Sequence, residues 1–159
     1  MEMSLRKKQT GFTLIELIII VAIIAILLVW AIPNFAPILR GYELRSSVDR
    51  VNNSIGWARA EAIRQQKFVM IEPDSSGWQG GWKVCIDGEA QDSCSTAATL
   101  LRTEEPMDNK ITAAAGSVSI IKINPSGMLL SSGKLVELTN GGKTTKLSLD
   151  MNRVIIKQL

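Results

Sequence analysis

An apolar run near the N-terminus constrains this chain more than any other feature of its sequence. The run extends from Phe12 to Ile32 and contains a single charged residue, Glu16. A helix over these residues would be about 31 Å long, close to the thickness of the hydrocarbon core of a membrane. The run therefore predicts a membrane-spanning helix. An acidic side chain inside such a segment costs about 3 kcal/mol on insertion scales, so Glu16 is expected to have a function.

The residues before the run decide between different kinds of apolar segment. A polar leader carries Arg6, Lys7 and Lys8, and basic residues of this kind hold an N-terminus in the cytoplasm. A cleaved secretory signal has a shorter apolar region, about 7–15 residues, followed by small residues at the cut. A plain membrane anchor explains the length of the run, but it explains neither Glu16 nor the glycine at position 11. An N-terminal signal that includes both Gly11 and Glu16 fits the sequence better than a secretory signal or a plain anchor.

The order of basic leader, Gly11, Phe12, Glu16, apolar helix and Pro33 resembles the class III signal of type IV pilins and type II secretion pseudopilins. The resemblance implies that residues 1–11 are a leader peptide, which a prepilin peptidase removes after Gly11. It also implies that the same enzyme methylates the new terminal amine of Phe12.

In that family the apolar helix is retained, so residues 12–32 would serve as the transmembrane and later the filament-core helix. The resemblance gives Glu16 the task of meeting the N-terminal amine of a neighbouring subunit. Opposite charges at about 4 Å attract strongly in a low-dielectric helix bundle, and they offset desolvation only when they meet in register. Glu16 is therefore expected to set the register between subunits.

Residues 33–67 are predicted to continue the helix as an amphipathic half. Pro33, Pro37 and Gly41 weaken helical hydrogen bonding, and we interpret 33–41 as a bend within one long helix. Apolar residues resume directly afterwards at helical spacing: Leu44, Val48, Val51, Ile55, Ala58 and Ala62. The basic residues fall mostly off this seam, on a surface that is either solvated or in contact with a neighbouring subunit: Arg40, Arg45, Arg50, Arg59, Arg64 and Lys67.

Residues 68–159 are predicted to form one β-rich globular domain, because period-two alternation and turn residues replace the helical period. The predicted strands are Phe68–Glu72, Trp82–Asp87, Leu100–Thr103, Val118–Asn124, Leu135–Thr139, Thr144–Leu149 and Arg153–Lys157. The predicted turns are residues 125–127, 140–142 and 150–152.

This order of elements resembles the GspH/FimT family, whose members are FimU-like and FimT-like minor pilins of type IV pili and a minor pseudopilin of type II secretion. The residues that carry the likeness are Gly81-Trp82-Lys83-Val84, Cys85 to Cys94, Leu100-Leu101-Arg102, Ile123-Asn124-Pro125-Ser126-Gly127 and a last strand at Arg153. The resemblance implies an α+β type IV pilin fold, a long N-terminal helix packed on a mainly antiparallel sheet.

The implied function is that of a FimU-like minor pilin, a structural subunit near the pilus tip that helps to start assembly and serves twitching motility, adhesion or DNA uptake. The alternatives are a GspH-like minor pseudopilin of type II secretion and a FimT-like DNA-binding minor pilin. The implied partners are other minor and major pilins, the prepilin peptidase and, before assembly, lipid of the inner membrane. The C-terminal domain would be periplasmic in a Gram-negative cell and would later lie on the cell surface.

The two cysteines of the chain, Cys85 and Cys94, both follow the anchor, on what should be the oxidising periplasmic side. A disulfide between them is expected and would contribute about 2.5–3 kcal/mol by the chain-entropy model. Two free buried thiols are the alternative.

Charge is unevenly distributed along the chain. The formal net charge is +3, of which the leader supplies +2, so the net charge of the chain does not identify a binding partner. Residues 68–109 are acidic, whereas residues 110–159 hold seven basic and two acidic residues, a balance of +5. Four of the basic residues are candidates for a DNA-binding face: Lys143, Lys146, Arg153 and Lys157. The Gly-Arg-x-Arg motif of DNA-binding FimT-like members reads Asn152-Arg153-Val154-Ile155 here, so subunit packing is the favoured role of this half.

The sequence contains no residue pattern typical of a catalytic site. The chain has no histidine, so the usual triads are missing, and two cysteines alone do not make a zinc site. Gly142-Lys143-Thr144 imitates the end of a P-loop, but the earlier glycine is replaced by Glu137. The acidic residues Asp87, Glu89 and Asp92 lack the EF-hand pattern. We expect a structural protein without a cofactor or a metal.

Overall fold

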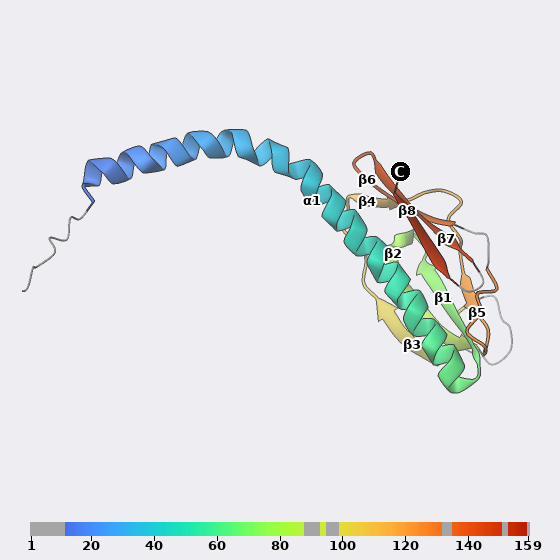
Figure 1. Ribbon diagram of the computed structural model, residues 1–159. Helices are drawn as coiled ribbons and strands as arrows, with labels where there is room; N and C mark the ends of the chain where they lie inside the picture. The colour runs from blue at the N-terminus through green and yellow to red at the C-terminus, as the bar shows by residue number, and fades with distance from the viewer. Residues whose placement is uncertain (1–11, 88–92, 95–98, 132–134, 151–152, 159) are drawn as a thin grey trace, which may run out of the picture. The chain divides into compact units, whose positions relative to one another are not determined.

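The computed structural model describes residues 12–87, 93–94, 99–131, 135–150 and 153–158, except for the side chains of residues 30–34, 87 and 135. Within these residues the chain forms one helix, α1, and eight strands (Figure 1). It divides into two compact units, Met1–Ile38 and Leu39–Leu159. α1 runs from Leu14 to Gln65 and contributes to both units. The predicted leader, residues 1–11, lies outside the described residues.

Local chemistry defines both ends of α1. Thr13 precedes its first residue, and the Thr13 hydroxyl oxygen accepts a hydrogen bond from the backbone N–H of Glu16 at 3.3 Å, an N-cap. Glu16 also places an acidic group in the first turn, where the helix dipole favours negative charge. At the other end Gln66 adopts a φ of 55°, and the N–H of Lys67 donates to the carbonyl of Ala62 at 3.3 Å. This is the Schellman closure of a helix.

α1 continues without interruption through residues 33–41, so the prediction that this segment does not end the helix is confirmed. In the second unit the predicted seam is buried in full, with no member more than 3% exposed: Leu44, Val48, Val51, Ile55, Ala58 and Ala62. Period 3.6 places these residues on one face, and that face packs against strands of both sheets.

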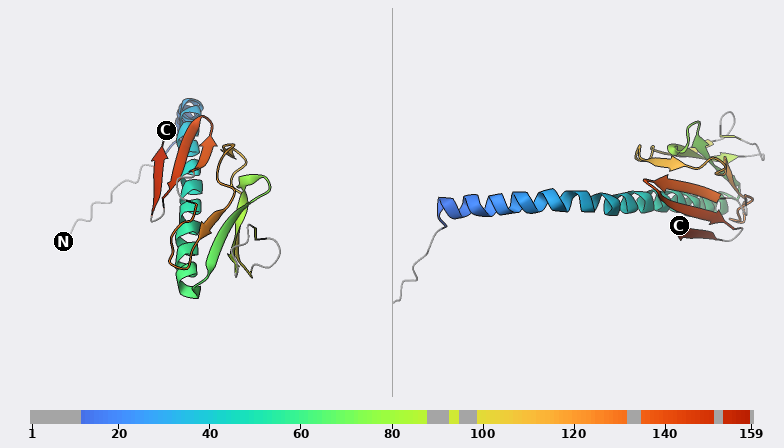
Figure 2. Two further views of the ribbon diagram at one scale, coloured as in Figure 1. Left: turned by 90° about the vertical axis from the view of Figure 1, so that its right-hand side faces the viewer. Right: turned by 90° about the horizontal axis from the view of Figure 1, so that it is seen from above.

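Two antiparallel sheets complete the second unit, and both lie along the same half of α1 (Figures 1 and 2). The first sheet has the order β3-β2-β1-β5 and the second has the order β4-β6-β7-β8. Their strands are β1 (Phe68–Asp74), β2 (Gly77–Asp87), β3 (Thr99–Glu104), β4 (Ile111–Ala113), β5 (Ile121–Ile123), β6 (Leu135–Asn140), β7 (Lys143–Leu149) and β8 (Val154–Gln158).

Six of the seven predicted strands are present, although β2 begins at Gly77 and not at the predicted Trp82, and two further details of the prediction are wrong. β4 was not predicted, because it has three residues and no alternation to recognise. Residues 118–120 were predicted as strand but lie in a loop before β5. Val118 is buried because this loop passes beneath Trp78, whose indole N–H donates to the Val118 carbonyl at 2.8 Å. Burial by a loop gave the same apolar signal as burial in a sheet.

The predicted turn at residues 125–127 is present and is organised by Asn124. The side-chain oxygen of Asn124 accepts hydrogen bonds from the N–H groups of Ser126 at 3.0 Å and Met128 at 2.8 Å. Gly127 has a φ of 79°, and a Cβ there would lie 2.8 Å from the Cδ1 atom of Ile63 on α1. Glycine is therefore required both by the backbone and by the close approach of the helix. The turn at residues 141–142 is also present, and residues 151–152 lie outside the described part.

Candidate functional site

The N-terminal signal is the first group of predicted site residues. Gly11 lies outside the described residues, and Phe12 is 78% exposed just before α1. Glu16 is exposed on the first turn, where its backbone, not its side chain, contacts Thr13. Thr13 is a residue that our sequence analysis missed. The spacing Thr-x-x-Glu before an apolar run is the signature of a capping box and would have identified it.

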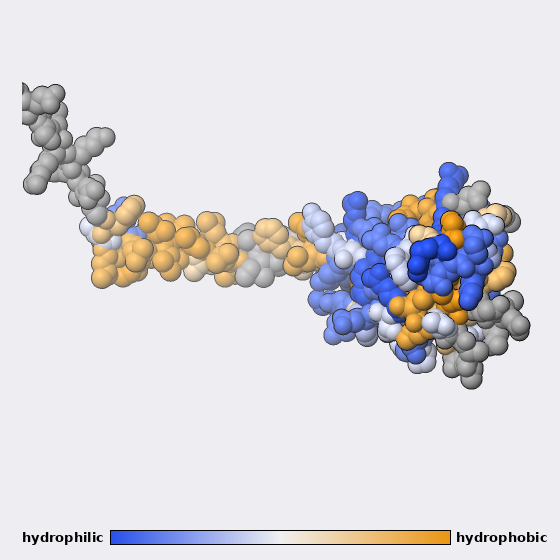
Figure 3. Space-filling model, turned by 90° about the horizontal axis from the view of Figure 1, so that it is seen from below, coloured by the Kyte–Doolittle hydropathy of each residue, from blue (hydrophilic) through white to orange (hydrophobic). Residues whose placement is uncertain are grey.

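The apolar surface of the first unit is large and uncovered. Between Leu14 and Val29 the leucine, isoleucine and valine side chains are 41–76% exposed, and they contribute to the orange surface of this part of the chain in Figure 3. A soluble monomer seldom exposes a contiguous patch of this size, so the surface indicates a lipid or protein environment. Counted over the described residues, no helix is both long enough and apolar enough to cross a membrane.

Polar contacts from the loops and strands hold the second half of α1. Asn140, at the end of β6, is 1% exposed, and its amide donates to the carbonyl of Arg40 at 3.3 Å and to the Glu43 carboxylate at 3.0 Å. Lys110 lies 3.5 Å from the other carboxylate oxygen of Glu43. The two contacts of Asn140 join residues about a hundred positions apart in sequence, so no local sequence pattern predicts them.

Arg50 makes a second set of such contacts further along α1. Its guanidinium donates to the carbonyl of Glu105 at 2.7 Å and lies 3.6 Å from the Glu104 carboxylate. It also stacks 5.4 Å from the ring centroid of the buried Trp82, within cation–π range. Arg50 therefore links the helix to the chain that follows β3. This basic residue has a structural role within the subunit.

The disulfide expected between Cys85 and Cys94 is present, and a carboxylate reinforces it. Cys85 is fully buried on β2, while the N–H of Cys94 donates to Glu72 on β1 at 2.7 Å. The Ser93 hydroxyl donates to the same carboxylate at 3.2 Å. Covalent and polar links therefore fasten residues 93–94 to the first sheet, on the face opposite α1. Glu89 and Asp92 of the acidic loop lie outside the described residues.

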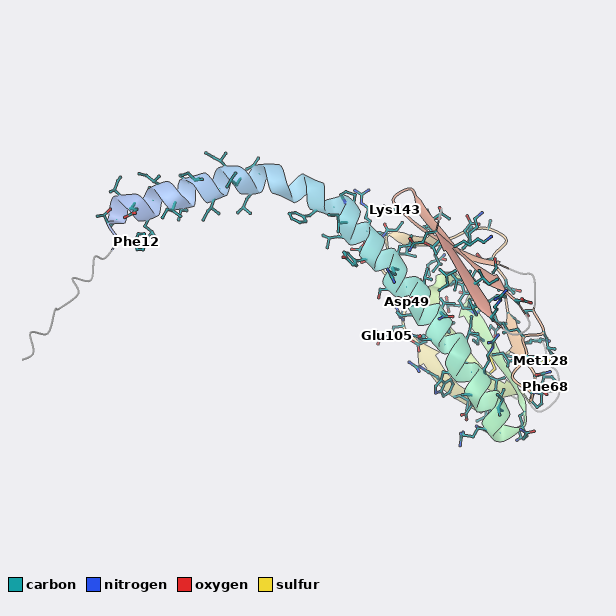
Figure 4. All side chains as sticks on the ribbon, viewed as in Figure 1. Phe12, Asp49, Phe68, Glu105, Met128 and Lys143 are labelled. Atoms are coloured by element: carbon teal, nitrogen blue, oxygen red, sulfur yellow. A yellow bond between two sulfur atoms is a disulfide. The ribbon has the colours of Figure 1, made fainter. Side chains whose placement is uncertain are left out.

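The four basic residues proposed for DNA do not form one patch. Lys143 lies on the helix side of the second sheet, since a Cβ on Gly41 of α1 would be 3.2 Å from its ammonium (Figure 4). Lys146 and Lys157 are cross-strand neighbours on the opposite face, and Lys146 pairs with Glu137 at 3.2 Å. Arg153 is exposed directly before β8. Because strand side chains alternate, the spacing of Lys143 and Lys146 already predicts opposite faces.

One acid–base pair near the end of α1 has a shifted pKa. Hydrogen bonds from Arg64 and then from Gln65 lower the pKa of the Glu61 carboxyl, and the same contact with Glu61 raises the pKa of Arg64. The pair lies three residues apart on one helix, so it stabilises the last turn of α1. Within the described residues no group of acidic, histidine or cysteine side chains is arranged to hold a metal.

Comparison with known proteins agrees with this geometry. The family model "Type II transport protein GspH" matches residues 47–154, and the model "Prokaryotic N-terminal methylation motif" matches residues 6–32. Two crystal structures of the type IV minor pilin FimU from Pseudomonas aeruginosa share the fold, with TM-scores of 0.60 and 0.57 at 21% identity. They cover 73% and 72% of this chain, and 89% and 92% of their own chains.

A curated relative, the type IV major fimbrial protein FimA of Dichelobacter nodosus, is 47% identical over 97 residues. The match covers 60% of this chain and 59% of the length of that protein. A long N-terminal helix on antiparallel sheets, with a methylation motif that extends into the start of the helix, defines the type IV pilin class, whose members are structural proteins. Within that class the chain belongs to the GspH/FimT family of minor pilins and pseudopilins.

Proposed function

We propose that this chain is a FimU-like minor pilin, a subunit near the tip of a type IV pilus that helps to start pilus assembly. The observation that supports the proposal best is the presence in one chain of the methylation motif over residues 6–32 and the GspH-type domain over residues 47–154. The likeness of the fold to FimU, which is described as a type IV minor pilin, favours the pilus over the secretion system.

The proposal gives each N-terminal residue a role. The peptidase cleaves after Gly11 and methylates Phe12, and residues 12–32 anchor the subunit in the inner membrane until assembly. The uncovered apolar side chains of this helix then exchange lipid for the helices of neighbouring subunits in the filament. Glu16 stands exposed on the first turn, where the terminal amine of a neighbour is able to reach it. A mismatch in register would leave that carboxylate buried without a partner, which is strongly unfavourable.

Deletion of the gene tests the proposal against the secretion alternative. A subunit that starts assembly should change the number of pili per cell far more than their length, because each filament needs only one start. We expect at least a tenfold loss of surface pili, and an epitope tag on the complementing copy should be labelled at filament ends. Both are measured by electron microscopy of sheared and immunogold-labelled pili. Normal piliation together with a loss of secreted enzymes would instead identify a type II secretion pseudopilin.

DNA reception is a second candidate, because Lys146, Lys157 and Arg153 lie on or next to the outer face of the second sheet. The split of the four candidates between two faces and the pairing of Lys146 with Glu137 argue against it. We expect that glutamine at Lys143, Lys146, Arg153 and Lys157 together lowers pilus number while DNA affinity is already weak. The assay is DNA binding by the full chain in detergent near physiological salt, where non-specific affinity is about 10⁻⁴–10⁻⁶ M. Submicromolar binding that the quadruple variant loses, with piliation unchanged, would favour the receptor.

A further inference from the structure

The four edges of the two sheets differ in how well they are protected against pairing with another strand. β4 and β5 are three residues long, which leaves little backbone to pair. β3 is longer, but its register with β2 shifts between Val84 and Cys85, and it carries the charged residues Arg102 and Glu104. β8 carries one charged side chain, Lys157, but it is longer than β4 and β5 and its register has no shift. It reads Val-Ile-Ile-Lys-Gln, pairs in regular register with β7, and contains no proline.

The hydrogen-bond pattern of the β7–β8 pair identifies the backbone groups on the open side of β8. The N–H of Asp150 donates to the carbonyl of Arg153 at 2.9 Å, so this opposed pair is hydrogen-bonded. Hydrogen-bonded and non-hydrogen-bonded pairs alternate in an antiparallel ladder, so residues 155 and 157 also bond to β7. The N–H and C=O groups of Val154, Ile156 and Gln158 therefore point away from β7. Among the described residues no strand lies beyond them (Figure 2).

The side chains of β8 give this edge a definite chemistry. Ile156 is 41% exposed on the helix-facing side, which favours an apolar neighbour. On the other face Arg153, Ile155 and Lys157 follow one another at alternate positions. They would occupy non-hydrogen-bonded positions toward an added strand, where opposed side chains approach most closely. The complementary strand therefore carries acidic residues opposite Arg153 and Lys157 and apolar residues between them.

We propose that the open edge of β8 is a docking site for an extended acidic strand of a neighbouring pilus subunit. The assignment of the donor to a subunit rests on the proposed function, whereas recognition of an acidic strand rests on the edge itself. Strand addition of this kind takes affinity from main-chain hydrogen bonds and specificity from alternate side chains. It orients one subunit against the next in a way that packing between helices alone does not.

A synthetic peptide tests the edge directly. The probe is a fluorescent Ser-Glu-Val-Val-Val-Glu-Ser peptide, whose core reads the same in both directions and so fits either orientation of the added strand. We expect the full chain in detergent to bind it at least about tenfold more tightly than the matched peptide with lysine in place of glutamate. Fluorescence anisotropy near physiological salt measures both affinities, with a DNA oligonucleotide as a competitor. No binding, equal binding of the lysine peptide, or DNA as the stronger ligand would overturn the proposal.

Three variants separate the contribution of the backbone from that of the charges. Ile156→Pro removes one outward N–H while leaving the hydrogen bonds to β7 in place, and Ile156→Ala keeps that N–H with a similarly shortened side chain. We expect the proline variant to lose about tenfold in peptide affinity and the alanine variant to stay within about threefold. Arg153→Glu with Lys157→Glu should reverse the preference between the two peptides. This reversal tests the edge even if the proline variant does not fold.

The same variants in cells test the donor. We expect Ile156→Pro to lower pilus number while Ile156→Ala leaves it unchanged. Peptide binding together with normal piliation in the Ile156→Pro strain would overturn the assignment of a pilus subunit as donor. Failure of the proposed function would appear separately, as unchanged piliation in the deletion strain, whatever the peptide does.

Discussion

Replacement of Gly11 by leucine should leave the chain as an uncleaved precursor and remove it from pili. Gly11 stands between the basic leader and the apolar run, inside the matched methylation motif. A peptidase whose site accepts glycine before the cleaved bond needs no space for a side chain there. We therefore expect the branched side chain of leucine to prevent cleavage. The uncleaved leader would also keep Arg6, Lys7 and Lys8 attached to a helix that must enter an apolar filament core, which is costly for charged groups.

Intact-mass measurement of the membrane-extracted chain checks this result. The native chain should lack residues 1–11 and carry one extra methyl group on Phe12, while the Gly11→Leu chain should retain its full length without the methyl group. Gly11→Ala is the matched control, because its single added carbon tests size alone, and we expect it to be processed at least partly. Normal trimming of the leucine variant would show that Gly11 is not the processing position.

Much of the fold could be predicted from the sequence where one period continues for many residues. The seam from Leu44 to Ala62 holds its spacing for five turns of helix, and burial follows that spacing without exception. The ends of β6 and β7 could be predicted from the alternating residues on either side of Gly141-Gly142. Short or irregular elements gave no such signal. The glycine-rich start of β2 resembled a loop, although residues 77–81 belong to the strand.

The candidate site was harder to predict, because its contacts join distant parts of the sequence. Asn140 reads as a turn residue, and its buried contact with Glu43 depends on where the second sheet meets α1. Arg50 reads as one of several surface charges, but its guanidinium holds the chain after β3. The cysteine pair is an intermediate case. Its pairing followed from compartment and number, whereas the contribution of Glu72 needed the sheet register that places β1 beside β2.

Loss of the Cys85–Cys94 disulfide should lower the stability of the β-rich unit more than any single surface change. The bond closes a short loop, which by the chain-entropy model contributes about 2.5–3 kcal/mol. For a chain of this size that free energy corresponds to a fall in Tm of about 5–12 °C. A double Cys85→Ala, Cys94→Ala variant avoids free thiols that would pair with other chains. Thermal unfolding of the exported chain in detergent, followed by far-UV circular dichroism, measures the change.

The variant Glu72→Gln separates the covalent link from the polar link to the same residues. Glutamine retains a side-chain oxygen for the N–H of Cys94 and the Ser93 hydroxyl but loses the charge that strengthens both hydrogen bonds. We expect Glu72→Gln to lower the free energy of unfolding by only about 1 kcal/mol in the presence of the disulfide. The loss should be larger when the disulfide is also absent, because the hydrogen bonds to Glu72 then hold residues 93–94 to the sheet without the covalent link. Intact-mass analysis with and without reductant confirms the redox state of each sample. Equal melting temperatures for the native chain and the double alanine variant would mean that Glu72 and the sheet hold residues 93–94 without the disulfide.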